Sequence, residues 1–178
     1  MHIMAPKTKW ELSDMMKFAV EFGAPIAVRY PRGTAYDGLE EHRAPMEYGK
    51  AEWIYEEEEI ALFAVGSMVK TAEEVYEALK AVGKKVSLIN GRFIKPIDEE
   101  AVLKACENHK LIVVMEENVA SGGYGEKVLE CLNRNRKAVD FMHVHIPDAY
   151  VEHGNVDKLK AEIGIDAESI TKRILERV

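Results

Sequence analysis

The sequence has few cysteines and no excess of positive charge. Only Cys106 and Cys131 occur among 178 residues, and neither lies in a Cys-x-x-Cys pair, which excludes a zinc finger and a secreted disulfide framework. We therefore expect a reducing, cytoplasmic compartment. With 24 Lys and Arg against 31 Asp and Glu, the formal net charge is −7. General binding to nucleic acid is not expected, because neutralising phosphates requires an excess of basic residues.

Long apolar runs are also missing. The longest, residues 60–65 and 111–115, are far too short to cross a bilayer, and the N-terminus lacks the layout of a signal peptide, so no membrane association is expected. The sequence is 47% apolar and 31% charged, as in globular proteins. Its length allows one ordinary domain, or one domain plus a fragment of another.

Common catalytic motifs are incomplete. The glycines of residues 121–125 are not followed by a Walker lysine, a full Gly-x-Gly-x-x-Gly is absent, and no nucleophile elbow accompanies a Ser-His-Asp order. Two histidines, His143 and His145, lie two apart on an expected strand and share one face, with further acidic residues downstream. Because no fixed third ligand accompanies them, we expect no metal site.

The N-terminal part predicts one helix and one strand. Thr8 and Glu11 fit a capping box, apolar residues then recur at helical spacing, and Gly23 supplies the stop. Residues 24–30 are typical of a short buried strand. One helix and one strand cannot bury a core of their own, which suggests a chain cut from something longer. The next segment loses periodicity, and we interpret residues 37–48 as an interdomain linker.

From residue 49 onward, strands and helices alternate. The expected strands are residues 49–55, 60–65, 86–90, 111–115 and 141–146. The acidic residues 56–59 are interpreted as the solvated turn of a hairpin between the first two strands. One helix follows residue 67, and the later helices have expected caps at Asp98, Ser121, Asn155 and Asp166. This order predicts an α/β domain with a mostly parallel sheet and helices on both faces.

Two arginines, Arg29 and Arg32, follow the first expected strand. The carboxyl end of a strand is where open α/β sheets present ligand groups, and a planar guanidinium can bind two phosphate oxygens at once. The residues alone favour two interpretations. The arginines bind a phosphate, or one of them pairs with a carboxylate across a domain boundary.

Other polar residues end later strands of the expected sheet. They are candidate interface residues: Asn90, Arg92, Glu116 and Glu117. The glycine-rich residues 121–125 then open a helix whose backbone donors could hold an anion. The adjacent carboxylates would repel an anion, so tight packing of strand against helix, with the acids pairing a neighbouring domain, is the preferred interpretation.

Several blocks together resemble the carboxyl-terminal portion of the 1-deoxy-D-xylulose-5-phosphate synthase family, within the transketolase group, over essentially the whole chain. The blocks are residues 4–7, 26–33, 66–68, 90–98, 116–118 with 122–125, and 146–148 with 152–154. The resemblance implies a transketolase-type carboxyl-terminal domain in residues 49–178, preceded by residues 1–36 as the incomplete tail of a pyrimidine-binding domain. The blocks at Arg29 and Asn90 are the most specific to this family.

The resemblance also implies an activity. The family uses thiamine diphosphate and magnesium to decarboxylate pyruvate and join the two-carbon unit to glyceraldehyde 3-phosphate, for isoprenoid, thiamine and pyridoxal synthesis. Arg29 matches the position that binds the acceptor phosphate, and Arg32 is a weaker candidate. Asn90, Arg92, Glu116 and Glu117 are expected at domain or dimer contacts.

The family's cofactor-binding and catalytic segments have no counterpart in this sequence. We therefore expect the isolated chain to be inactive and to bind no cofactor. Its expected partners are the missing regions of the same enzyme and the second subunit of a homodimer. The alternatives are a stand-alone interaction or regulatory module of the same fold, and the matching part of a transketolase or a 2-oxo-acid dehydrogenase β subunit, against which residues 29–33 argue.

Overall fold

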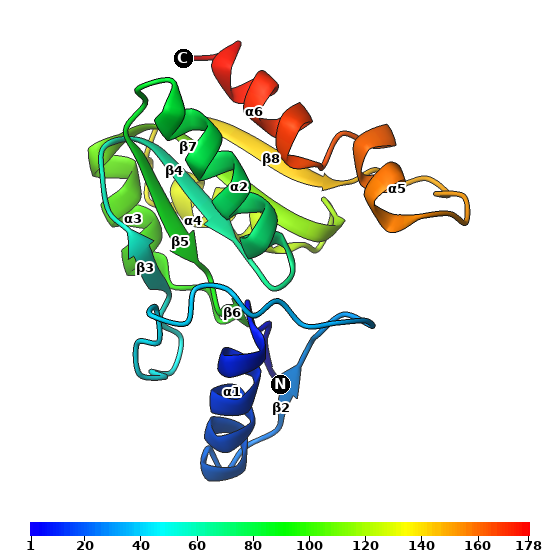
Figure 1. The fold of residues 1–178 in the computed structure, drawn as a ribbon. Helices are drawn as coiled ribbons and strands as arrows, with labels where there is room; N and C mark the ends of the chain where they lie inside the picture. Colours follow the sequence, from blue (N-terminus) through cyan, green and yellow to red (C-terminus); the bar gives the residue numbers. More distant parts are fainter.

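The apolar runs of the sequence form a five-stranded sheet in a computed structural model that describes all 178 residues (Figure 1). The strand order is β3-β5-β4-β7-β8, with β3 at Glu52–Tyr55, β4 at Glu59–Ala64, β5 at Val86–Asn90, β7 at His109–Val119 and β8 at Asp140–Ile146. All neighbours are parallel except β3, which runs antiparallel to β5. The expected mostly parallel sheet is confirmed.

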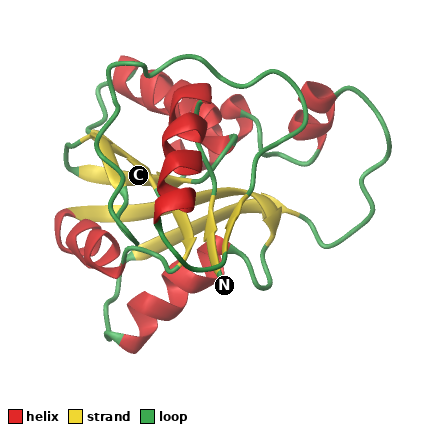
Figure 2. Ribbon diagram, turned by 90° about the horizontal axis from the view of Figure 1, so that it is seen from below, coloured by secondary structure: helices red, strands yellow, loops and turns green.

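Helices cover both faces of this sheet, as expected (Figure 2). Helices α2 (Met68–Ala81) and α6 (Ala167–Leu175) cover one face, and α3 (Glu99–Asn108) and α4 (Tyr124–Arg134) cover the other. The short helix α5 (Val156–Glu162) lies before α6. No helix is long and apolar enough to span a membrane.

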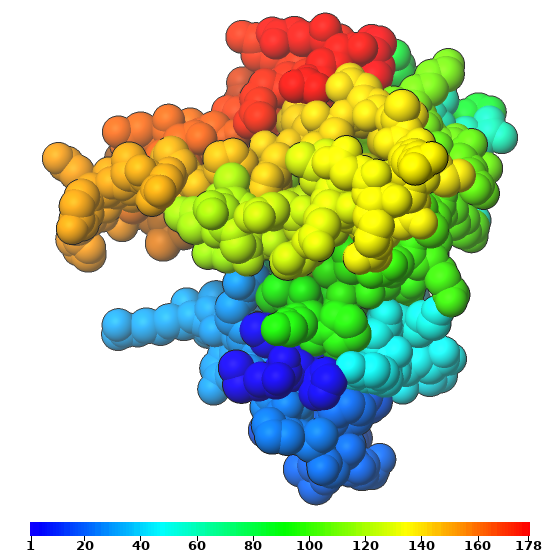
Figure 3. Space-filling model, turned by 180° about the vertical axis from the view of Figure 1, so that it is seen from behind, coloured from blue at the N-terminus to red at the C-terminus, as the bar shows by residue number.

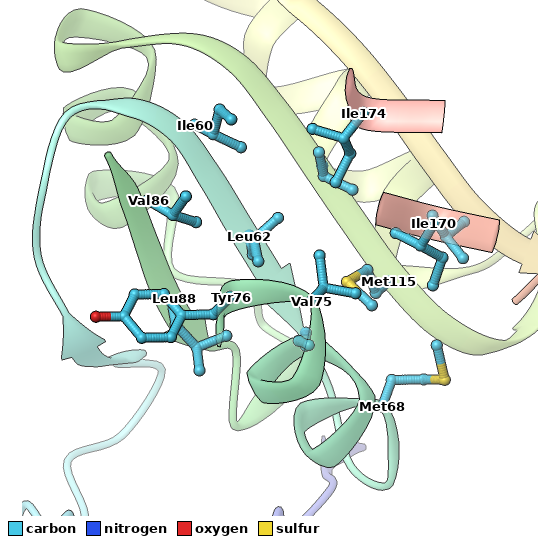
Figure 4. Close-up of a cluster of buried hydrophobic side chains, with 14 of the residues drawn as sticks. Ile60, Leu62, Met68, Val75, Tyr76, Val86, Leu88, Met115, Ile170 and Ile174 are labelled. Atoms are coloured by element: carbon cyan, nitrogen blue, oxygen red, sulfur yellow. The ribbon is translucent and has the colours of Figure 1, made fainter. Parts of the chain in front are cut away.

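Successive side chains along each strand point to opposite faces of the sheet and so form two hydrophobic cores. On β4, Ile60 and Leu62 point into a cluster of 21 buried residues beneath α2 and α6, whereas Ala61 and Phe63 point into a cluster of 13 beneath α3 and α4. Figure 4 shows the first cluster, in which side chains of α2 and α6 meet those of the strands. We call the five-stranded sheet with helices α2 to α6 the main domain.

The expected hairpin between residues 49–55 and 60–65 is wrong. Strand β3 lies at the edge of the sheet, as expected, but it pairs with β5 and not with β4. The Ser87 hydroxyl, at the start of β5, accepts a hydrogen bond from the Glu57 amide at 2.9 Å and donates to its carbonyl oxygen at 3.0 Å. The acidic turn therefore crosses the start of β5, which pairs with β3 on one side and with β4 on the other.

A second, three-stranded sheet lies below the main domain. Its order is β2-β1-β6, with β1 at His2–Met4, β2 at Ile26–Val28 and β6 at Phe93–Lys95, and helix α1 (Lys9–Glu21) packs beside it. A small core joins Met4, Met15 and Phe93. We call these four elements the N-terminal lobe, which protrudes below the main domain in the space-filling view (Figure 3).

Strand β6 belongs to the N-terminal lobe although it follows the main-domain strand β5 in the sequence. It pairs antiparallel with β1, which pairs parallel with β2. The residues between β2 and β3, which include the expected linker at 37–48, contain no helix or strand. The chain therefore crosses between the two parts three times: through this segment, from β5 into β6, and from β6 back into α3.

Most expected helix caps are confirmed, and one is wrong. The side chains of Thr8, Asp98, Asn155 and Asp166 accept backbone N–H bonds at the starts of α1, α3, α5 and α6. Helix α4 is capped by Gly123, not by Ser121, and the cap makes no side-chain hydrogen bond. The buried Glu116 carboxylate supplies the missing acceptor, because it receives the backbone N–H groups of Tyr124 and Gly125 at 2.9 Å each.

Candidate functional site

The candidate residues gather where the N-terminal lobe meets the carboxyl edge of the main sheet. Parallel strands β4, β5 and β7 end at this edge, which places Ser67, Asn90 and Glu117 near the segment that follows β2. The Arg29 amide donates to the Met4 carbonyl oxygen at 2.8 Å, so the β1–β2 pairing extends to the first candidate arginine. The Arg29 side chain is exposed.

A cavity of about 840 Å³ lies beside this segment. Its walls are residues 30–36, the start of α2 with Ser67, Lys70 and Thr71, and the starts of α5 and α6. Arg32 lines the cavity, whereas Arg29 does not. In this structure, therefore, the residue expected to be the weaker phosphate ligand is the one that lines this cavity.

Glu117 connects the end of β7 to two neighbouring elements. The Ser67 hydroxyl donates to one carboxylate oxygen, and Lys160 of α5 pairs with the other at 2.9 Å. Burial alone would raise the pKa of Glu117, but the bonds from Ser67 and Lys160, with a further contribution from the Arg29 charge, lower this pKa overall. Glu117 is thus held as a carboxylate close to the candidate phosphate arginine.

Glu116 has a different environment from its neighbour. Its side chain is fully buried, and besides the two α4 amides it binds the His143 Nε2 atom at 2.8 Å. Burial alone would raise the pKa of Glu116, but the hydrogen bonds from His143 and the two amides lower it overall. All these partners lie in the main domain.

The glycines after β7 permit this close packing. A Cβ at Gly123 would lie 2.4 Å from the Glu116 Oε1 atom, and one at Gly125 would lie 2.2 Å from the His143 Nε2 atom. The tight packing of strand against helix that we preferred for residues 121–125 is confirmed. The expected pairing of the acids with a neighbouring domain stays a prediction, because within this chain Glu116 and Glu117 pair with groups of the main domain.

Asn90 and Arg92 lie in a buried charge cluster between the N-terminal lobe and the main domain. We use this name for five residues that are each at most 5% exposed: Lys7, Glu11, Glu52, Asn90 and Arg92. Two cations and two carboxylates balance the charge of the cluster. Such burial is tolerated only when each charge is paired and hydrogen-bonded.

The contacts in the buried charge cluster are short and mutual. The Arg92 guanidinium lies 2.8 Å from Glu11 and 3.1 Å from Glu52, and the Lys7 ammonium lies 2.5 Å from Glu52 and 3.4 Å from Glu11. Asn90 donates to both Glu11 carboxylate oxygens at 2.8 and 3.0 Å. Burial tends to raise the pKa of Glu52, but Arg92 and Lys7 lower it overall.

The cluster also holds the segment between the two parts of the chain. The Arg92 guanidinium donates to the carbonyl oxygens of Ala44 at 2.8 Å and Pro45 at 3.0 Å, and Glu52 accepts from the Ala44 amide at 3.0 Å. Asn90 and Arg92 therefore contact the N-terminal lobe and this segment within one chain. Their expected contacts with other domains or a second subunit stay predictions.

Three members of the cluster were not expected from the sequence. Lys7 and Glu52 resemble ordinary surface charges, and Glu11 fits the capping box. The first half of that box is present, because the Thr8 hydroxyl accepts from the Glu11 amide at 3.2 Å. The Glu11 carboxylate, however, accepts from the Lys7 amide at 2.7 Å, and so turns away from the Thr8 amide and into the cluster. No local signal distinguishes it from a capping acid.

The acidic and histidine side chains of this chain are not gathered into a cluster of metal ligands. No group of three or more His, Cys, Asp or Glu side chains lies where it could hold a metal ion. His143 and His145 do share a face, with ring centroids 4.7 Å apart, but His143 binds Glu116 and His145 binds the Ile146 carbonyl oxygen.

Comparison with known families agrees with this fold. Residues 49–170 match the family model described as "Transketolase, C-terminal domain". The chain belongs to this family. The match begins just before β3 and ends in the first turn of α6, so it covers nearly all of the main domain and also includes β6.

Two curated relatives that match nearly the whole chain have the same name. A protein of Lachnoclostridium phytofermentans named 1-deoxy-D-xylulose-5-phosphate synthase is 47% identical over 173 residues, which are 97% of this chain and 28% of that protein. A protein of the same name from Caldanaerobacter subterraneus is 40% identical over 98% of this chain, again 28% of that protein. The chain thus spans about 28% of the length of these relatives.

Solved structures share the whole fold. A split-gene transketolase, described as an inactive β4 tetramer, superposes with a TM-score of 0.88 at 22% identity, over 98% of this chain and 56% of that chain. Transketolase from Campylobacter jejuni gives a TM-score of 0.73 at 15% identity, over 99% of this chain and 26% of that chain. These similarities show the fold and include the N-terminal lobe.

Proposed function

We propose that this chain is the carboxyl-terminal part of a 1-deoxy-D-xylulose-5-phosphate synthase, a thiamine-diphosphate-dependent transferase. The complete enzyme condenses pyruvate, with decarboxylation, and glyceraldehyde 3-phosphate to 1-deoxy-D-xylulose 5-phosphate, for isoprenoid, thiamine and pyridoxal synthesis. The observation that carries this proposal is 47% identity to a synthase of that name across 97% of the chain.

We propose that the N-terminal lobe contains parts of two domains. Residues 1–36 are proposed as the tail of the pyrimidine-binding domain, 37–48 as the linker and 49–178 as the carboxyl-terminal domain. The start of the family match at residue 49 supports this division. Strand β6 then belongs by sequence to the carboxyl-terminal domain but completes the sheet of its neighbour.

We propose that the cofactor of this enzyme binds outside this chain. Thiamine diphosphate supplies the electron sink for decarboxylation, and its magnesium needs several oxygen ligands. The acidic groups at the sheet edge are already engaged, because Glu116 binds His143 and two amides and Glu117 binds Ser67 and Lys160. We propose that the isolated chain is inactive, and that the regions outside it and a second subunit complete the active enzyme.

Within this enzyme, Arg29 is the proposed ligand of the acceptor phosphate and Arg32 a secondary one. Arg29 is exposed at the end of β2, where its backbone is fixed by Met4 and its side chain is free to turn to a ligand. Arg32 adds positive charge in the cavity beside it. Both positions suit an anionic substrate group.

The variant Arg29→Ala in the full-length enzyme tests this role. Because the backbone bond to Met4 does not need the side chain, folding is retained. Loss of one charge-assisted phosphate contact, about 1.5–3 kcal/mol, raises the KM for glyceraldehyde 3-phosphate roughly 10- to 150-fold and leaves the KM for pyruvate unchanged. Arg43→Ala is a matched control, because Arg43 is also exposed and pairs only with Asp14. An unchanged acceptor KM in Arg29→Ala refutes the role.

A stand-alone module of the same fold is the alternative. It is favoured by one observation: the similar split-gene transketolase shows that this fold occurs in a chain shorter than a complete transketolase. An immunoblot of the source cell with antibody against this chain separates the two. A band several times larger than 20.1 kDa supports the synthase, and a band at 20.1 kDa supports the module.

A further inference from the structure

We propose that Arg92 is a positioning residue for Arg29, through which the carboxyl-terminal domain sets the phosphate arginine of its neighbour. This inference rests on the proposed function of Arg29. It assigns to the buried charge cluster a role in substrate selection as well as in joining the two parts of the chain.

The first support is a continuous backbone path from Arg92 to Arg29. The Arg92 carbonyl oxygen accepts from the Ala5 amide at 2.9 Å, and the carbonyl oxygen of the preceding residue, Met4, accepts from the Arg29 amide at 2.8 Å. Strand β1 therefore lies between the two arginines and is bonded to both. A displacement of the Arg92 backbone would move the end of β2 with it.

The second support is the constraint on Arg92 itself. Its φ angle is +51°, in the left-handed region that residues with a side chain rarely adopt. The Asn90 side-chain oxygen accepts from the Arg92 amide at 3.2 Å, and the guanidinium is held by Glu11 and Glu52. This conformation lets the side chain enter the buried charge cluster while the carbonyl oxygen points to β1. Removal of the guanidinium releases the restraint that stabilises it.

The third support is that the main domain approaches Arg29 from a second side. Glu117, at the end of β7, is fixed by Ser67 and Lys160, and both of these residues line the same cavity as Tyr30, which directly follows Arg29. The segment that begins at Arg29 is thus bonded to Arg92 through β1 and faces, across the cavity, the two residues that fix Glu117. Both come from the domain that contributes no proposed phosphate ligand of its own.

Arg92→Met in the full-length enzyme tests the inference, with glyceraldehyde 3-phosphate and unphosphorylated glyceraldehyde as alternative acceptors. The readout is the ratio of kcat/KM for the two aldehydes. A misplaced Arg29 lowers this ratio by about tenfold to a hundredfold, because displacements near 1 Å have effects of that size. The double variant Arg29→Ala with Arg92→Met shows the same ratio as Arg29→Ala alone, since the two residues act through one contact.

Two further variants keep the test decisive. Glu11→Leu combined with Arg92→Met removes one charge of each sign and leaves Lys7 paired with Glu52, so it tests the same loss if Arg92→Met does not fold. Arg134→Met is the matched control, because Arg134 is exposed and its ion pair with Glu99 joins two helices of the main domain, α4 and α3. The ratio is unchanged in this control.

Three results would overturn the inference. If the Arg92 variants lower kcat/KM equally for both aldehydes, Arg92 is only structural. If Arg29→Ala lowers the ratio but the Arg92 variants do not, the proposed phosphate role stands and the positioning role fails. If Arg29→Ala itself leaves the ratio unchanged, both fail.

Discussion

The buried carboxylate of Glu116 provides the sharpest test of how this domain is stabilised. In Glu116→Gln the side chain keeps its size but loses its charge, and it presents an NH₂ group to one of the two α4 amides at 2.9 Å. One charge-assisted bond, about 1.5–3 kcal/mol, is lost and one buried donor is left unsatisfied, at about 1–3 kcal/mol. We expect the free energy of unfolding to fall by about 3–5 kcal/mol, and the melting temperature by roughly 10 °C.

The same carboxylate predicts a pH dependence. Folding lowers the pKa of Glu116. Its contribution to the free energy of unfolding is therefore complete above the unfolded-state pKa of about 4.3, and it is lost as the pH falls through the lower folded-state pKa. Urea unfolding of wild type and Glu116→Gln should therefore differ most near neutral pH and converge in acid. The control is Glu126→Gln on the same helix, where the carboxylate is exposed. Equal losses in the two variants, or parallel pH profiles, would refute the reasoning.

Two other substitutions test the packing. Gly125→Ala should lower the melting temperature despite the higher helix propensity of Ala, because the new Cβ would lie 2.2 Å from His143, whereas Gly154→Ala, with no atom nearer than 3.5 Å, should not. Leu88→Ala should lower the free energy of unfolding in urea by about 2–5 kcal/mol, because Leu88 is fully buried. Val82→Ala should lower it little, because Val82 is exposed, and similar losses at both positions would contradict the assigned core.

The sequence predicted the elements that have strong periodicity. The five strands of the main sheet and the helices between them were located, because their apolar residues repeat over four or more positions. Strands β1 and β6 were missed because each has only three residues and, unlike the equally short β2, neither lies in a longer stretch that is typical of a buried strand. They are strands because each finds a partner far along the chain, and such pairing leaves no local pattern. The false hairpin has the same origin, because adjacency in sequence did not decide the partner of β3.

The site was predicted less completely than the fold. Position at strand ends identified Arg29, Asn90 and Glu117, which the structure does bring to one edge. The buried charge cluster could not be recognised, because Lys7 and Glu52 have the residue types of solvent-exposed positions. Only the close approach of the N-terminal lobe makes them buried, and that approach depends on contacts across more than forty residues of sequence, such as the one between Lys7 and Glu52.

An exchange of segments tests the central claim most directly. The part of the Lachnoclostridium phytofermentans synthase that matches this chain is replaced by residues 1–178, and formation of 1-deoxy-D-xylulose 5-phosphate from pyruvate and glyceraldehyde 3-phosphate is measured. The matching part of Campylobacter jejuni transketolase, with the same fold at 15% identity, is the control exchange. We predict product formation with this chain and none with the control. A folded exchange enzyme that carries this chain and forms no product would contradict the account.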